Sequence, residues 1–173
     1  SLFNGAPPDG DLATEYWSQA AKIPARHTEA VNQLKAINAS SPGNADLQSA
    51  LARMLIADGR SEEGYAVLEQ MAKNNTGRDA AAVIWYQQIQ GMTVSDNSVA
   101  ALKRFLSVFS EGDTVVAARQ QLDAQQKQLA DPEFRARARG LAAVEAGKGG
   151  SAVAELQQAV SKNHQDRDRK SVV

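Results

Sequence analysis

The stretch that decides the fold is residues 45–73, ADLQSALARMLIADGRSEEGYAVLEQMAK. Residues 45–57 favour a helix, Asp58-Gly59-Arg60 favours a tight turn, and residues 62–73 favour a second helix. Gly59 supplies the positive φ that a tight turn between two helices requires. The stretch therefore predicts an antiparallel pair of helices.

The same pattern recurs along the chain at a fixed step of 34 positions. Trp17, Leu51 and Trp85 follow one another at this step, and so do Ala30 and Gly64. The same step separates Pro8 from Pro42, Leu34 from Leu68, and Ile37 from Met71. A fixed period of this length indicates an array of repeats in which each unit is one helix pair.

The composition of the chain supports a purely helical fold. Its 173 residues include 31 alanines and five prolines, and 43% of them are hydrophobic, which is enough for a core. Nineteen basic and twenty acidic residues give a net charge of −1, so no global field attracts nucleic acid or an anionic membrane. No cysteine is present, and no apolar run approaches the ~20 residues of a membrane helix. We therefore expect an all-α protein that contacts neither nucleic acid nor membrane.

The units differ in detail along the chain. Asp11 and Thr28 are the predicted N-caps of the first pair. A long turn at residues 91–96 is expected to shift the buried face of the next helix by three positions, to Ala101. Residues 113–130 predict a helix that fits no pair, at a junction that could bend. The predicted boundaries are residues 1–10 for the end of a preceding repeat, 11–44 and 45–78 for two repeats, 79–112 for a repeat with an extended turn, 113–132 for an unpaired helix and linker, 133–164 for a last repeat, and 165–173 for a disordered tail.

A helix–turn–helix unit of this period, with small residues at fixed places, resembles the tetratricopeptide repeat. In that family a small side chain lets the two helices of a pair approach closely, and a proline such as Pro42 ends the unit. The resemblance implies a right-handed solenoid of antiparallel helix pairs. It gives a packing role to Trp17, Ala30, Leu51, Gly64, Trp85, Ala101, Gly140, Ala152 and Ala159.

At a finer level the sequence resembles the periplasmic part of the cellulose synthase operon protein C family of bacteria. The resemblance lies in residues 2–8, 15–17, 22–26, 67–73, 127–132 and 134–138, and it extends to about residue 163. In that family a long periplasmic repeat region precedes an outer-membrane β-barrel that exports the glucan. The resemblance implies that this chain is a piece of the repeat region, located in the periplasm, and that its partners are proteins of the cellulose synthase complex.

The inventory of chemical groups predicts no catalytic residue, no metal site and no cofactor. Only His27 and His164 are present, and neither has a nearby arrangement of acidic residues that indicates a metal site. Residues 146–151, AGKGGS, follow a helix and lack the glycine spacing of a phosphate loop, so they predict a turn.

Two clusters admit a functional and a structural interpretation. Tyr16-Trp17 and Trp85-Tyr86 could stack on sugars, but both tryptophans fall on the apolar position of the period, which favours core packing. The arginines at positions 135, 137 and 139 could bind nucleic acid, but their spacing spreads them over two helix faces, which favours a solvated surface.

The remaining candidate is a groove lined by the first helix of each unit, where a peptide can bind. Whether its polar side chains bind a partner or are merely solvated stays open. The leading hypothesis is a non-catalytic scaffold that links the synthase to the export pore, and the alternative is direct binding of glucan or peptidoglycan, with hydrolysis a weaker third. The candidate groove contacts are Glu15, Gln19, Ser49, Arg53, Gln87, Gln90 and Arg137.

Overall fold

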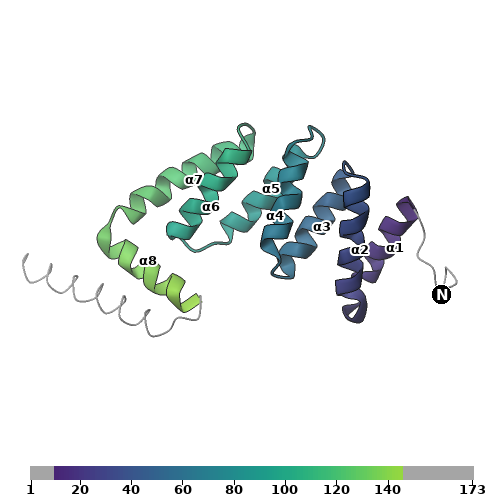
Figure 1. The fold of residues 1–173 in the computed structure, drawn as a ribbon. Helices are drawn as coiled ribbons and strands as arrows, with labels where there is room; N and C mark the ends of the chain where they lie inside the picture. Colours follow the sequence, from purple (N-terminus) through teal and green to yellow (C-terminus); the bar gives the residue numbers. More distant parts are fainter. Residues whose placement is uncertain (1–9, 146–173) are drawn as a thin grey trace, which may run out of the picture. The chain divides into compact units, whose positions relative to one another are not determined.

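In the computed structural model, residues 10–145 are described, and all the regular secondary structure in this range is helical. Figure 1 shows the helices following one another as a series of hairpins. The chain divides into two compact units, residues 1–85 and 86–173, and the boundary falls inside α5. The α-helices are α1 (Asp11–Ala20), α2 (His27–Ser40), α3 (Ala45–Ala57), α4 (Ser61–Ala72), α5 (Arg78–Gln90), α6 (Asp96–Val108), α7 (Asp113–Leu129) and α8 (Pro132–Glu145), with a short 3₁₀ turn, η1 (Pro24–Arg26), before α2.

The pair α3–α4 in the first unit forms as the sequence predicts. The Asn44 side chain accepts a hydrogen bond from the Leu47 amide at 3.0 Å and so caps α3. Gly59 has φ of 77° in the turn. A β-carbon built on Gly64 would lie 2.7 Å from Ile56 Cγ1 and 3.0 Å from the Ala52 carbonyl oxygen. The two helices therefore meet at a distance that only glycine permits without a shift.

The core of the first unit contains the residues that define the period. Trp17 and Trp85 are 4% and 1% exposed, and Ala30 and Leu51 are fully buried. Tyr65 stacks on Trp85 with ring centroids 4.8 Å apart and an interplanar angle of 27°. Both indoles are therefore packing groups, with little surface left for a sugar to stack on.

Two predicted N-caps in the first pair are wrong. Gly10, with φ of 74°, precedes α1, and Asp11 is the first residue inside the helix. Thr28 lies inside α2, which begins at His27. For Thr28 the physical reason is that the fixed φ of Pro24 begins the η1 turn, which leads directly into α2.

The predicted three-position shift in the second unit is also wrong. Ser98 is fully buried, whereas Ala101 is only half-buried. The period continues unchanged, because three buried residues of α6 each lie one period after a residue of α4. These pairs are Gly64 and Ser98, Leu68 and Leu102, and Met71 and Phe105. The turn at residues 91–95 is longer than the turn at 58–60, yet it does not change which residues of α6 are buried. The small packing residue of α6 is therefore Ser98.

Helix α7 contacts the end of α5 through Tyr86 and packs against α6. The Tyr86 hydroxyl donates to Gln121 Oε1 at 2.8 Å, and the Ser98 hydroxyl donates to Gln125 Oε1 at 2.7 Å. Buried Val115 extends a series of buried residues that recur once per period, Ala13, Leu47 and Ala81. This continuity favours α7 as a further first helix of the series. The predicted boundaries around it stay predictions.

Helix α8 packs against α7 and makes surface ion pairs with the start of α6. Arg135 and Arg139 lie 3.0 Å and 3.5 Å from the carboxylate of Asp96, and Arg137 pairs with Glu133 within α8. Ala138 and Gly140 are buried on the same helix. The predictions for residues 1–9, for Ala152 and Ala159, and for the tail 165–173 fall outside the described residues.

Candidate functional site

One histidine has the acidic neighbour that the sequence did not predict. His27 Nδ1 lies 2.5 Å from the carbonyl oxygen of Ala21, and Nε2 lies 2.8 Å from both carboxylate oxygens of Asp58. Two hydrogen-bond acceptors suit an imidazolium with a proton on each nitrogen. The hydrogen bond to Ala21, followed by that to Asp58, raises the pKa of His27 above its ordinary value of 6.5.

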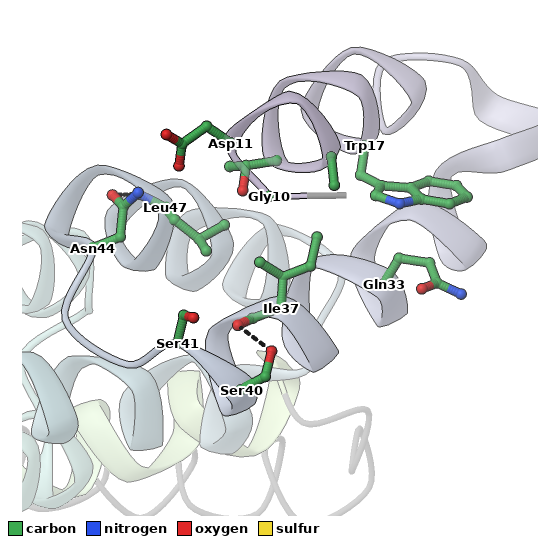
Figure 2. A pocket seen from close by; sticks show the side chains of 11 residues that line it. Gly10, Asp11, Trp17, Gln33, Ile37, Ser40, Ser41, Asn44 and Leu47 are labelled. Carbon is green, nitrogen blue, oxygen red and sulfur yellow. Dashed lines mark hydrogen bonds between the residues drawn. The ribbon is translucent and has the colours of Figure 1, made fainter. Parts of the chain in front are cut away.

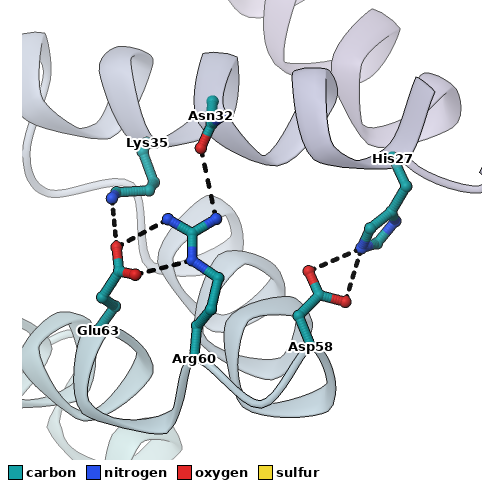
Figure 3. Close-up of polar contacts among 6 residues, drawn as sticks. All are labelled: His27, Asn32, Lys35, Asp58, Arg60 and Glu63. Atoms are coloured by element: carbon teal, nitrogen blue, oxygen red, sulfur yellow. Dashed lines mark hydrogen bonds and ion pairs between the residues drawn. The ribbon is translucent and has the colours of Figure 1, made fainter.

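This pair joins two consecutive turns and is no metal site. His27 begins α2 and Asp58 lies in the turn between α3 and α4, as Figure 3 shows. Within residues 10–145 no group of three or more His, Cys, Asp or Glu side chains is placed to hold a metal ion. The sequence gives no sign that Asp58 lies beside His27, because residues 31 positions apart meet only when two pairs stack.

A second polar cluster links α2 to the start of α4 (Figure 3). The Glu63 carboxylate accepts hydrogen bonds from Arg60 Nε at 2.7 Å and Arg60 Nη2 at 2.8 Å, and it also pairs with Lys35 Nζ. Arg60 Nη1 donates to Asn32 Oδ1 at 3.4 Å. Arg60 first, and then Lys35, lower the pKa of Glu63 to about 2. The cluster is a surface connection between two repeats.

The predicted groove residues are mostly on the surface. Ser49 is half-buried, and the other six, Glu15, Gln19, Arg53, Gln87, Gln90 and Arg137, are exposed. Gln19 and Arg53 occupy the same place in successive repeats, since they are one period apart. That these residues bind a partner stays a prediction.

Glu15 and Gln19 share a hollow of about 370 Å³ on α1. Its apolar side is formed by Leu12 and Ile23, which are 61% and 50% exposed. The Arg26 guanidinium closes one side, where Nη1 donates to the Tyr16 hydroxyl at 2.9 Å. The first unit therefore presents an apolar surface with a polar rim beside two of the predicted groove residues.

A different hollow, of about 350 Å³, lies between the start of α1, the end of α2 and the start of α3 (Figure 2). Trp17, Ile37 and Leu47 form an apolar wall, and polar side chains surround it. Sequence reasoning missed this hollow, because its residues come from three helices and form no motif. One signal in the sequence points to it. Thr14 and Ile37 are shorter than Gln48 and Met71, the residues at the same places one period later, so they leave space unfilled.

Among the helices between residues 10 and 145, none combines the length and the apolar character needed to cross a bilayer.

Comparisons with known proteins match the repeat pattern and the finer resemblance. Residues 25–89 match the tetratricopeptide repeat family. The chain is 64% identical over 167 residues to cellulose synthase operon protein C of Escherichia coli K12, covering 96% of this chain and 14% of that protein. It is 63% identical over 167 residues to the Salmonella typhimurium LT2 protein of the same name, again covering 96% and 14%.

A solved structure agrees with the fold. A crystal structure of the flexible tandem repeat domain of a bacterial cellulose synthase component superposes with a TM-score of 0.73 at 67% identity. The match covers 75% of this chain and 54% of that one. The chain thus has an all-α tetratricopeptide fold and spans about one seventh of the length of its relatives, for which the covered share is 14%.

Proposed function

Because the chain belongs to the family of cellulose synthase operon proteins C, as part of their tandem repeat region, we propose that it is a non-catalytic protein-binding scaffold. In this proposal the segment lies in the periplasm and helps to link the cellulose synthase to the outer-membrane export pore. Its support is the identity of 63–64% to cellulose synthase operon proteins C together with the tetratricopeptide match. Tetratricopeptide arrays serve widely as surfaces for binding peptides and proteins.

The observation that carries the proposal is that the first helices of successive repeats bury one position and expose another at the same places. In the first unit, Trp17 and Leu51 are buried, whereas Gln19 and Arg53, two positions further on in α1 and α3, are exposed. A period that keeps a long polar side chain on the surface at the same place in each repeat builds a repeated recognition surface. The hollow beside Glu15 and Gln19 adds an apolar contact area to it.

The test is site-specific photocrosslinking in the full-length protein in cells that secrete cellulose. A photoreactive residue placed at position 19 or 53 should crosslink to a protein component of the cellulose synthase complex. The matched control is Ala36, which is exposed on α2, a second helix. Crosslinking that is equal at position 36, or absent at both 19 and 53 while cellulose is exported, would contradict the proposal.

A second readout is cellulose export by the Arg53→Glu variant. Reversing the charge should reduce export without lowering the amount of protein, because an exposed side chain contributes little to folding. Normal export with normal crosslinking would show that this surface is dispensable.

A further inference from the structure

Three amide side chains lie where α2, α3 and α4 come together in the first unit. Asn38 is two residues before the end of α2, Gln48 is three residues after the start of α3, and Gln70 is two residues before the end of α4. Helix α3 packs against both α2 and α4 as part of a series of hairpins, so its start lies beside the ends of the other two (Figure 1). The Asn38 Nδ2 group donates to Gln70 Oε1 at 3.3 Å, which agrees with this placement.

Two of these amides contain a buried atom that has no partner in the protein. Asn38 is 6% exposed and Gln48 is 1% exposed. Over the described range, 10–145, the Asn38 Oδ1 atom and the Gln48 Nε2 atom are buried without a hydrogen bond. The first is an acceptor and the second a donor, so the two atoms are complementary. Burial of a polar atom without a hydrogen bond costs free energy, and both atoms therefore need a partner.

The next junction between repeats contains neither amide. One period after Asn38 and Gln48, the chain has Ala72 and Ala82. Both alanines are buried, at 6% and 4% exposed, so the helices pack at this place without any polar side chain. Both amides are present at one junction and both are replaced at the next, which is the pattern expected of two groups that share one partner.

The chemistry of the three side chains restricts what that partner can be. All three are neutral amides, so an ion buried among them would lack a compensating charge. Asn38 and Gln48 do not bond to each other, although one offers an acceptor and the other a donor. Complementary groups that do not reach each other are the setting in which a water molecule bridges two side chains.

We propose that one water molecule is bound between α2 and α3 and bridges Gln48 to Asn38. Gln48 Nε2 donates to the water oxygen, and the water donates one proton to Asn38 Oδ1. The third partner is Gln70 Oε1, which accepts from Asn38 with one lone pair and keeps a second for the water. About three hydrogen bonds are typical of a buried water. The water joins helices of two successive repeats, and this inference goes beyond the proposed scaffold.

The first experiment measures magnetisation transfer from water to the side-chain amides of the 173-residue chain by NMR. We expect cross-peaks between water and the Gln48 Nε2 protons in NOE and ROE spectra, with opposite signs, because a buried water stays in place while the protein tumbles. The reference is the Gln120 amide, which is exposed on α7 and meets mobile surface water. Absence of the Gln48 cross-peaks, or the same result for Gln120, would overturn the proposal.

The variant Asn38→Ala tests whether the water is held by this pair of amides. Loss of the acceptor should abolish the cross-peak between water and Gln48. The matched control is Gln33→Ala, which removes an exposed amide from the same helix and should leave that cross-peak unchanged. An unchanged cross-peak in folded Asn38→Ala, or equal losses in the two variants, would contradict the assignment.

The double variant Asn38→Ala with Gln48→Ala reproduces the alanine pair of the next junction, so we expect it to fold. Its midpoint of urea denaturation should fall by less than the sum of the decreases in the two single variants, because neither partner of the water is then left behind. Strictly additive decreases would contradict a shared water.

The competing arrangement is a direct hydrogen bond between the two amides. It would give a scalar coupling between Gln48 Nε2 and Asn38 Cγ, without a water cross-peak at Gln48, and that result would overturn the proposal. The crosslinking expected at positions 19 and 53 does not depend on any of these outcomes, so the two proposals fail separately.

Discussion

Gly64 and Ser98 occupy the same place in successive second helices but make different contacts, Gly64 with α3 of its own pair and Ser98 with α7, the helix that follows. The two residues are one period apart, and both are buried. Gly64 leaves no side chain, so α4 lies directly against the Ala52 carbonyl and Ile56 of α3. Ser98 keeps a hydroxyl, which it directs to Gln125 on α7. The period fixes the size of the residue, and its polarity follows from the neighbouring helix.

The Gly64 contact should be the more sensitive of the two to added volume. Gly64→Val should lower the free energy of unfolding by about 2–3 kcal/mol, because its side chain would overlap Ile56 and the Ala52 carbonyl. Urea denaturation of the variant and wild type measures this loss. The control is Ala66→Val, an exposed site on the same helix, which should cost no more than about 0.7 kcal/mol through helix propensity. Equal losses for the two variants would show that the close approach at Gly64 is not a constraint.

The Ser98 contact should depend on its partner more than on its volume. Ser98→Ala should cost about 1–2 kcal/mol, because the buried Gln125 amide oxygen loses its donor. The double variant Ser98→Ala with Gln125→Leu should recover part of that loss, since the buried Gln125 amide is removed together with its donor, while the Ser95 amide still lacks its acceptor Ser98 Oγ. Strictly additive losses in a thermal-unfolding cycle would contradict a direct interaction.

The polar contacts of the first unit lie at its surface, so they should contribute less to the free energy of unfolding than the buried Ser98–Gln125 hydrogen bond of the second unit. The His27 pKa is raised in the folded state, so the His27–Asp58 contact stabilises the fold fully below the ordinary pKa of 6.5. That stabilisation is lost as pH rises through the raised folded-state value. We expect the melting temperature of wild type to fall from about pH 6 to about pH 9 more steeply than that of His27→Gln. Identical pH profiles, or an unchanged His27 pKa in Asp58→Asn, would refute the linkage.

The cluster of Lys35, Arg60 and Glu63 should contribute least to the free energy of unfolding, because all three of these charged side chains are partly exposed. The pKa of Glu63 is lowered to about 2, so its contribution is present above the ordinary value of 4.5 and is lost as pH falls towards 2. Arg60→Met should raise the Glu63 pKa more than Lys35→Met does, because Arg60 makes two of the hydrogen bonds. NMR titration of the Glu63 carboxyl measures both values, and the reverse order would contradict this assignment.

The sequence was most informative where the period and the polarity of residues agree. The predicted helix over residues 45–57 matches α3, because helix propensity and the glycine turn at Gly59 indicate the same bounds. Residues 62–73 were within one residue of α4 for the same reason. The burial of Trp17, Leu51 and Trp85 follows from one fixed step along the chain.

The failures share a cause, which is that a contact between helices leaves no local signal. Ala101 was predicted because the long turn was expected to shift the buried face by three positions, yet the buried residue is Ser98, whose hydroxyl bonds to Gln125. The partner of His27 is 31 positions away, so only the stacking of two turns reveals it. The hollow beside Trp17 results from side chains that are shorter than those in the next repeat, and the absence of volume forms no motif.

The glycine at position 64 has a consequence for the whole length of a repeat protein. In such a chain each helix pair is built on the one before it, so a rotation introduced at one pair is passed on to every later pair. The relatives of this chain are about seven times longer than it is, since it covers 14% of them. A few degrees of change in the crossing angle of α3 and α4 would therefore displace the far end of such an array by many ångströms. The missing β-carbon of Gly64 thus affects the direction in which later repeats extend, as well as the stability of the helix pair.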